Sequence, residues 1–411
     1  MWTSSGARVI WPNTGRLCPL PPVKILVVFG TRPEAIKMAP VVQELKRYPE
    51  EFTCSVAVTA QHREMLDQVL KLFAIEPQYD LNIMRPRQTL EEVTTRALEG
   101  LTRVLDQERP DMVLVHGDTT TTFVAALAAF YRQVAVGHVE AGLRTRDKYA
   151  PYPEEMNRRL TGALADLHFA PTAQARQNLL EEAVPADRIY VTGNTVIDAL
   201  KATVREDYRF EDPLLAGLDP KKRLILVTAH RRENWGRPLE DIFWALREIK
   251  GLYADVEIVF PVHKNPRVRS RAREILEGCR GIHLIEPLDY EPFVNLMARS
   301  YLVLTDSGGL QEEAPALGKP VLVLREVTER PEAVRAGTVC LVGTDREQIV
   351  AKVRELLDDR RKYLKMAQAV NPYGDGLASR RIRGFLRYYF GLSIVRPAEF
   401  VPPGEGEKVP I

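Results

Sequence analysis

The sequence lacks both of the glycine-rich fingerprints that commonly mark a bound dinucleotide or nucleoside triphosphate. Neither G-x-G-x-x-G nor G-x-x-x-x-G-K-[ST] occurs among the 411 residues. The first pattern accompanies dinucleotide binding, and the second cradles the phosphates of Walker-type ATPases. Their absence argues against nicotinamide-dependent oxidation and ATP hydrolysis, so we expect no cofactor.

Cysteine and net charge are also scarce. The four cysteines, Cys18, Cys54, Cys279 and Cys340, are scattered, without a C-x-x-C pair or a His/Cys cluster at zinc spacing. We therefore expect neither a disulfide framework nor a metal site, as in a cytoplasmic protein. The net charge is only +2, from 57 basic and 55 acidic residues, which argues against a nucleic acid or a membrane surface as partner.

Long apolar runs are missing as well. No run approaches the roughly 20 residues that span a bilayer, and residues 1–22 contain no apolar core of a signal peptide. We expect residues 1–22 and 394–411 to be flexible ends.

What the chain does contain is a regular alternation of apolar runs and amphipathic segments, typical of parallel strands covered by helices on both faces. The runs of the first half are KILVVFG, CSVAVTA, MVLVHGD, VAVGHVEAG, LHFAPT and IYVTGN. Those of the second half are RLILVTAH, VEIVFPVH, IHLIEP, YLVLTDSGG, PVLVL and TVCLVG. Two sets of about six runs predict an α/β fold with two Rossmann-like, doubly wound domains, at about 23–195 and 196–376. The last helix, about 377–390, could pack on either domain.

Polar clusters follow most of these runs. They include GTRPE, HGDT, HVEAGLR, TAHRREN, PVHKNP and DSGGLQEE. In open α/β sheets ligands bind beyond the carboxyl ends of the strands. Because both halves carry such clusters, the sequence predicts a site in the cleft between the domains.

The cluster after the first run combines a helix start with two cations. Thr31 and Glu34 match a capping box, which explains both residues structurally. Lys37 could pair with Glu34, but Arg32 has no such partner, and an anion at a helix start is the better explanation for it.

The cluster TDSGGLQEE repeats this logic in the second half. Ser307, Gly308 and Gly309 would let the backbone approach a phosphate, although S-G-G is also an ordinary turn. Glu313 would suit the two hydroxyls of a ribose.

Three acids at or after strand ends in the first half are candidates for proton transfer. Asp118 is either an N-cap or catalytic. For Glu154 and Glu155, i,i+4 pairing with Arg158 and Arg159 is the alternative, and it is the preferred interpretation for Glu155. Glu140 has no local cap or partner, which points to a tuned pKa.

Five of the histidines fall into two groups. His116, His138 and His168 lie within apolar runs, so we interpret them as structural. His230 and His263 follow strands of the second half, and we expect them to contact substrate or an anion, since their spacing forms no metal site.

With these residues in view, the chain resembles the non-hydrolysing UDP-N-acetylglucosamine 2-epimerases of bacteria. The resemblance runs from about Lys24 to Phe390. It rests on ordered motifs: FGTRPEAIKMAP, VHGDTTT, GHVEAGLRT, PYPEEMNR, TAHRRENWG, TDSGGLQEEAP and TERPEAV.

The resemblance implies the two-Rossmann arrangement shared with GT-B glycosyltransferases, with the last helix crossing back to the first domain. It implies reversible inversion of C2, from UDP-GlcNAc to UDP-ManNAc, by elimination and re-addition of UDP through 2-acetamidoglucal. The product would supply envelope polysaccharide, and the enzyme would be a homodimer.

The resemblance also implies residue roles. The acid/base set would be Asp118, Glu140 and Glu154, with Lys37 and His230 stabilising the departing diphosphate or positioning the sugar. The nucleotide-sugar contacts would be Arg32, Phe293, Ser307, Gly308, Gly309, Glu313 and Arg330. A second, activating UDP-GlcNAc would contact Gln61, Arg87, Glu154, Arg231 and His263.

Three other functions stay open at the level of sequence. A GT-B glycosyltransferase would form product only with an added acceptor, and a hydrolysing epimerase would release UDP and free ManNAc. A nucleotide-sugar sensor is disfavoured, because three carboxylates in the cleft would repel an anion that is only to be bound.

Overall fold

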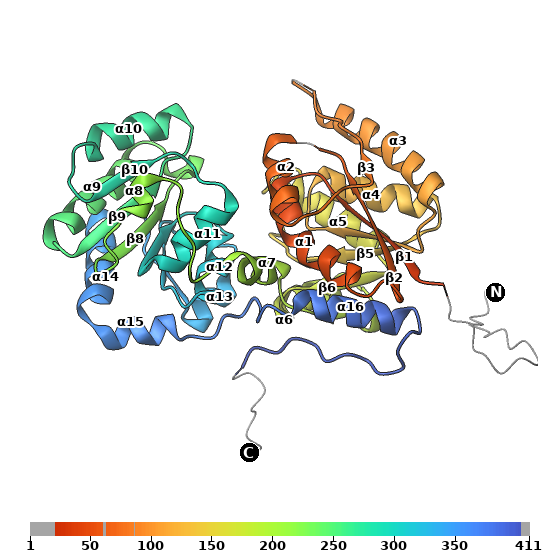
Figure 1. The fold of residues 1–411 in the computed structure, drawn as a ribbon. Helices are drawn as coiled ribbons and strands as arrows, with labels where there is room; N and C mark the ends of the chain where they lie inside the picture. The colour runs from red at the N-terminus through yellow and green to blue at the C-terminus, as the bar shows by residue number, and fades with distance from the viewer. Residues whose placement is uncertain (1–20, 61–62, 86, 404–411) are drawn as a thin grey trace, which may run out of the picture.

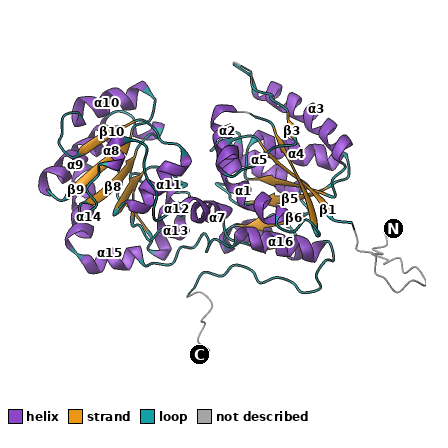
Figure 2. Cartoon of the chain, in the orientation of Figure 1, coloured by secondary structure: helices purple, strands orange, loops and turns teal. Residues whose placement is uncertain are grey.

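The computed structural model describes residues 21–403 except 61, 62 and 86, and it contains two α/β domains (Figures 1 and 2). The first domain holds a parallel sheet in the order β3-β2-β1-β4-β5-β6-β7, and the second holds a parallel sheet in the order β10-β9-β8-β11-β12-β13. Both orders reverse direction beside their first strand, which is the doubly wound pattern. The predicted fold class is confirmed.

The strands of the first sheet are β1 (Val23–Phe29), β2 (Phe52–Val58), β3 (Tyr79–Asp80), β4 (Met112–His116), β5 (Ala135–Val139), β6 (Leu167–Ala170) and β7 (Ile189–Val191). Those of the second are β8 (Arg223–Thr228), β9 (Val256–Pro261), β10 (Ile282–Ile285), β11 (Leu302–Thr305), β12 (Val321–Val323) and β13 (Val339–Leu341). Twelve of these strands coincide with the predicted runs. The edge strand β3 has only 2 residues, too few for an apolar run to reveal it.

The helices of the first half are α1 (Arg32–Lys46), α2 (Arg63–Leu72), α3 (Leu90–Glu108), α4 (Thr120–Tyr131), α5 (Glu154–Leu164), α6 (Ala173–Glu181) and α7 (Thr195–Thr203). Those of the second half are α8 (Pro213–Ala216), α9 (Arg237–Leu252), α10 (Pro266–Leu276), α11 (Tyr290–Arg299), α12 (Leu310–Ala316), α13 (Pro331–Ala336), α14 (Arg346–Asp358), α15 (Arg360–Ala367) and α16 (Ala378–Tyr389). Single 3₁₀ turns lie at Ala186–Arg188 and Arg232–Asn234. No helix in the described part of the chain is long and apolar enough to cross a bilayer.

Two helices join the domains. Helix α7 lies between them and contacts α1 and α16 as well as α11 and α12 (Figure 1). Helix α16 returns to the first domain, where Phe385 stacks on Tyr190 of β7 with ring centroids 4.0 Å apart. Arg383 of α16 also pairs with Glu44 of α1. These contacts fix the end of the chain on the first domain.

In its described part, which ends at residue 403, the predicted flexible tail, 394–411, packs against the first domain. Phe400 is only 4% exposed, and its backbone N–H donates to Val191 O of β7 at 2.7 Å. Glu399 pairs with Arg176 of α6. An apolar anchor and an ion pair therefore hold a segment whose Pro- and Glu-rich composition suggested disorder. Residues 404–411 and 1–20 lie outside the described residues.

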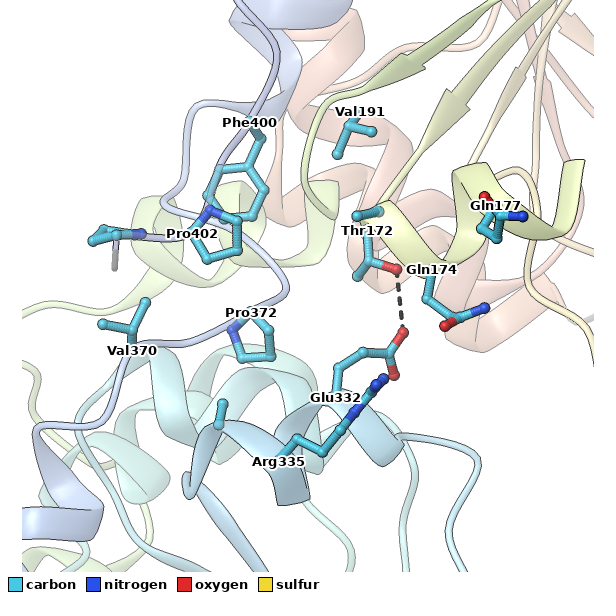
Figure 3. A pocket seen from close by; sticks show the side chains of 13 residues that line it. Thr172, Gln174, Gln177, Val191, Glu332, Arg335, Val370, Pro372, Phe400 and Pro402 are labelled. Atoms are coloured by element: carbon cyan, nitrogen blue, oxygen red, sulfur yellow. Dashed lines mark hydrogen bonds between the residues drawn. The ribbon is translucent and has the colours of Figure 1, made fainter. Parts of the chain in front are cut away.

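The same segment borders a cavity of about 620 Å³ at the seam between the domains (Figure 3). Phe400 and Pro402 line one side, and Thr172 and Glu332 meet on the other. Thr172 Oγ1 of the first domain donates to Glu332 Oε1 of the second at 3.2 Å. The seam is thus closed by a direct hydrogen bond between the domains.

Candidate active site

The turn after β1 is packed too tightly for any residue but glycine. A Cβ on Gly30 would lie 2.2 Å from Thr59 Oγ1 and 2.5 Å from Thr121 Oγ1. Glu34, 2% exposed, accepts from the Thr31 backbone N–H at 2.8 Å and from Thr119 Oγ1 of the next turn at 2.7 Å. The predicted bond from Glu34 to the helix start is therefore present. It also ties together the turns after β1 and β4, at the point where the strand order reverses.

A cavity of about 490 Å³, here called the central cavity, opens beside this turn between the two domains. It gathers nine of the predicted site residues: Arg32, Lys37, His230, His263, Phe293, Ser307, Gly309, Glu313 and Arg330. An adjoining cavity of about 510 Å³ shares Ser307, Gly309 and Arg330 with it and adds Gly308 and Arg231. The clusters after strands of both sheets therefore meet, as the sequence predicted.

Glu140 lies directly after β5 in a left-handed backbone conformation, with φ of +60°. Its side chain is 8% exposed, and all of its recorded contacts converge on one oxygen, Oε2. Lys37 Nζ donates to that oxygen at 2.5 Å and Asn194 Nδ2 at 2.9 Å, while His116 Nε2 lies 3.5 Å away. Within the described residues Oε1 has no such partner, so one oxygen of the Glu140 carboxylate is anchored and the other is not.

The charges of this pair stabilise each other. Burial alone would raise the pKa of Glu140, but the charges of Lys37 and His116 outweigh it and hold the pKa well below the usual value. Burial would lower the pKa of Lys37, and the charges of Glu140 and Glu312 raise it instead. At neutral pH the site therefore contains a carboxylate beside an ammonium group, and the ammonium lines the central cavity.

Glu312, on α12, extends this cluster into the second domain. It is 2% exposed, accepts from Asn194 Nδ2 at 2.6 Å and forms an ion pair with Arg330. The charge of Glu312 raises the pKa of Arg330 against the effect of burial. Glu140 and Glu312 thus each have one cation, and Asn194 lies between the two carboxylates.

Asp118 belongs to a second cluster, which lies entirely in the first domain. Thr119, not Asp118, caps α4, so the N-cap interpretation of Asp118 is wrong. Arg158 holds the Asp118 carboxylate with two hydrogen bonds, at 2.6 and 2.9 Å. His138 contacts the Gly117 carbonyl at 2.7 Å, and burial lowers the pKa of this histidine to about 3, so it supports the turn as a neutral ring.

Glu155 anchors the loop before α5. It is fully buried and accepts from the backbone N–H groups of Thr145 and Arg146 and from Arg158. The structural interpretation of Glu155 holds, but its partner is Arg158 at i,i+3, and Arg159 instead pairs with Glu182. Arg158 therefore bridges Glu155 and Asp118.

His230 is oriented by a buried acid. Its Nδ1 lies 3.1 Å from Asp306 Oδ1, and its backbone N–H donates to Asp306 Oδ2 at 2.7 Å. The His230 and His263 rings stack with centroids 5.6 Å apart. Both rings line the central cavity, in line with a contact to substrate. No cluster of three metal-ligating side chains occurs in residues 21–403 as far as they are described.

Glu313 differs from the other carboxylates. Burial raises its pKa to about 8, with the neighbouring Glu312 adding to the effect and Lys37 opposing it. Near neutral pH this side chain is mostly a neutral acid in the wall of the central cavity, where it has both a hydrogen-bond donor and an acceptor to offer.

Five predicted site residues are not placed in the two cavities: Asp118, Glu140, Glu154 and Arg87, which line neither of them, and Gln61. Glu154 begins α5 and is half-buried, and Arg87 is exposed with φ of +59°. Gln61 lies outside the described residues.

Sequence reasoning missed Asn194, Glu312, Arg158 and Asp306, and it treated His116 as structural only. Asn194 and Glu312 had ordinary local explanations, as an N-cap and a first-turn acid. His116 lies at the end of β4, and the signal that could have identified it is its place two residues before Asp118. Arg158 pairs with Asp118, and Asp306 with His230, and only the folded structure shows these partners.

Comparison with known proteins gives a consistent result. The family model described as UDP-N-acetylglucosamine 2-epimerase matches residues 43–387. The UDP-N-acetylglucosamine 2-epimerase of Bacillus subtilis strain 168 is 58% identical over 378 residues, which are 92% of this chain and 98% of that protein. The enzyme of the same name from Escherichia coli K12 is 59% identical over 367 residues, 88% and 97% of the two chains.

Solved structures agree. The S. aureus MnaA–UDP co-structure is 52% identical with a TM-score of 0.84, covering 92% of this chain and 100% of the other. UDP-GlcNAc 2-epimerase from Neisseria meningitidis bound to UDP-GlcNAc is 52% identical with a TM-score of 0.81, covering 89% and 99%. The glycotransferase of kitacinnamycin, at 13% identity and a TM-score of 0.58, covers 88% and 98% and shares the fold alone.

Proposed function

The chain belongs to the UDP-N-acetylglucosamine 2-epimerase family, and we propose that it interconverts UDP-GlcNAc and UDP-ManNAc without net release of free sugar. The observation that carries the chemistry is the ionised Glu140 carboxylate 2.5 Å from the Lys37 ammonium, which itself lines a cavity between two domains. A base beside a cation suits proton removal coupled to departure of an anion.

The reaction proceeds by elimination. A base takes the proton from C2 while the C1–O bond breaks, so that UDP leaves and 2-acetamidoglucal forms. UDP then adds back to C1 as C2 is protonated from the opposite face. One proton and one UDP leave and return, so the sequence is balanced and needs no oxidant. Because the two proton transfers occur on opposite faces, two acid/base groups are required.

The residue roles that we propose are those implied by the family resemblance. Glu140 is one acid/base group, and Asp118 and Glu154 are the candidates for the other. Lys37, Arg32 and Arg330 supply positive charge to the diphosphate, and His230 supplies a hydrogen bond. The support is that all four line the central cavity.

The nucleotide contacts come mainly from the second domain. Ser307, Gly308 and Gly309 offer backbone N–H groups to the phosphates, Glu313 contacts the ribose and Phe293 lies beside the uracil. The presence of UDP or UDP-GlcNAc in two similar structures supports nucleotide binding in this cleft.

A second UDP-GlcNAc acts as activator at Gln61, Arg87, Glu154, Arg231 and His263, and the enzyme is a cytoplasmic homodimer that supplies ManNAc for envelope polysaccharide. The support is that His263 lines the central cavity and Arg231 the adjoining one. Gel filtration with light scattering tests the dimer, and the dependence of UDP-ManNAc turnover on added UDP-GlcNAc tests the activator.

The deciding experiment is a proton NMR time course of the protein with UDP-GlcNAc alone in deuterium oxide. UDP-ManNAc carrying deuterium at C2, with no accumulation of free ManNAc, is the expected result. Accumulation of UDP and ManNAc would instead indicate a hydrolysing epimerase. A spectrum unchanged until an acceptor is added would indicate a glycosyltransferase.

A further inference from the structure

Asn194 is the residue at which the two domains and their two buried carboxylates meet. It is 2% exposed and precedes α7, whose first turn it caps by accepting from the Val196 backbone N–H at 3.1 Å. Its own backbone N–H donates to Tyr373 O at 2.7 Å, in the segment that leads back from the second domain to α16.

Both hydrogens of the Asn194 amide are used. Nδ2 donates to Glu140 Oε2 of the first domain at 2.9 Å and to Glu312 Oε2 of the second at 2.6 Å. A neutral amide with two donors is suited to this place, because it contacts two negative groups without adding charge. Capping α7 requires only the oxygen, so capping does not account for these two bonds.

Each of the two carboxylates is also paired with a cation that lines the cavity. Lys37 is paired with Glu140 and Arg330 with Glu312, and both cations line the central cavity. A diphosphate that binds there competes for both cations. Asn194 lines neither the central nor the adjoining cavity, so a ligand bound there does not compete for its bonds to the carboxylates.

We propose that Asn194 is a positioning residue that couples α12, which follows the phosphate-binding turn Ser307–Gly309, to the acid/base carboxylate Glu140. The amide fixes the position of the Glu140 carboxylate relative to the second domain. Nucleotide binding at the second domain thereby orders the base in the first domain. This inference deepens the proposed function and rests on it for the role of Glu140.

The groups that face Glu140 determine what loss of the amide does. They are Lys37 from α1, His116 from β4 and Asn194, with Glu312 and Arg330 acting at longer range from the second domain. A hydrogen bond donated to the ionised carboxylate lowers its pKa, and the nearby charge of Glu312 opposes ionisation. Removal of the amide hydrogens therefore raises the pKa of Glu140.

Two variants separate the hydrogen bonds from the Asn194 amide to the two carboxylates from the capping of α7 by Asn194. Asn194→Ser keeps an N-capping oxygen but is too short to reach both carboxylates, and Asn194→Asp keeps size and cap but replaces the donors with a negative charge. Asn371→Ser is the matched control. Asn371 lies in the segment that also contains Tyr373, and its Nδ2 donates to the backbone O of Glu312 at 2.8 Å without contact to either carboxylate.

The expected result is a fall in kcat of about tenfold to a hundredfold for Asn194→Ser, as for loss of a hydrogen bond to a charged group. The acid limb of the pH profile moves to higher pH, further for Asn194→Asp than for Asn194→Ser, while UDP affinity stays within about threefold because no nucleotide contact is lost. An unchanged acid limb in both Asn194 variants, or an equal shift in Asn371→Ser, would overturn the proposal.

A readout without turnover keeps this test separate from the test of function. In the wild-type protein, UDP should slow hydrogen exchange of the peptide that contains Glu140, and Asn194→Ser should abolish that slowing. If the wild type binds UDP but does not epimerise, loss of the slowing still supports the coupling while the proposed function fails. Equal slowing in wild type and variant would overturn the coupling even in an active enzyme.

Discussion

The two carboxylates that follow β4 and β5, Asp118 and Glu140, have contrasting surroundings. Glu140 is 8% exposed and belongs to a cluster that crosses from Lys37 through Asn194 to the second domain. Asp118 is 28% exposed, and its side chain is held within the first domain by Arg158. Two acids at neighbouring strand ends are thus tied to different parts of the molecule.

This difference suits the two acid/base roles of the proposed reaction. A reaction with proton transfers on opposite faces needs two groups in unlike environments. Glu140 is linked to Glu312 of the second domain through Asn194. Asp118 responds to the loop that Glu155 anchors, since Arg158 contacts both acids. Closure of the cleft should therefore affect Glu140 more directly than Asp118.

The largest expected effect comes from removing either charge by an isosteric amide. Glu140→Gln and Asp118→Asn should each lower kcat by about 10²-fold or more, because each removes a proposed acid/base group. The NMR time course measures turnover and calorimetry measures UDP affinity, which should remain close to that of the wild type. Normal turnover in Asp118→Asn would show that Asp118 is not the second acid/base group beside Glu140, and the two carboxylates would then not differ in catalytic role.

Next in size is the stability effect of removing the cation of the Glu140 cluster. Lys37→Met leaves the buried Glu140 carboxylate without its ammonium partner, which should lower the free energy of unfolding by about 3 kcal/mol. Urea denaturation at pH 7 measures it. The double variant Lys37→Met/Glu140→Gln should recover part of the loss, and a double variant no more stable than the single one would contradict the ion-pair explanation.

A smaller effect is expected for the cation of the Asp118 cluster. Arg158→Gln removes the bonds to Asp118 and Glu155, but Asp118 is more exposed, so water replaces part of what is lost. We expect a decrease of about 1 to 2 kcal/mol in the free energy of unfolding. Arg159→Gln, next along α5 and paired only with the partly exposed Glu182, is the matched control and should change little. If Arg158→Gln lowered the free energy of unfolding as much as Lys37→Met does, the two clusters would not differ in their contribution to stability.

The smallest expected effect concerns pH and the third buried acid of the cleft, Glu313. Burial raises the pKa of Glu313 to about 8, above its value in the unfolded chain. The stability that the protonated Glu313 side chain contributes is therefore complete at pH values below the ordinary pKa of a carboxyl group. It is lost as the pH rises from that value through about 8. Thermal unfolding between pH 5 and 9 should show a shallower decline for Glu313→Gln than for wild type. If the unfolding temperature declined equally with pH in wild type and Glu313→Gln, the result would contradict a neutral Glu313 side chain.

The sequence permitted much of the site to be predicted because strand ends are recognisable. Apolar runs end at Phe29, Thr228 and Thr305, and the polar residues that follow them converge on one cleft by the rule for parallel sheets. The residues that were missed share a different property. Asn194 and Glu312 are a helix cap and a first-turn acid by local pattern, and their contact spans 118 positions of the chain.

By itself, the sequence determined the two α/β domains, the cleft between them and the family, because apolar periodicity and ordered motifs are local properties. Only the tertiary structure decided which partner each charge has: Lys37 with Glu140 rather than Glu34, Arg158 with Asp118, and Asn194 between the carboxylates of two domains. The physical reason is that ion pairs and hydrogen bonds act over a few ångströms in space. The chain brings such neighbours together only when it is folded.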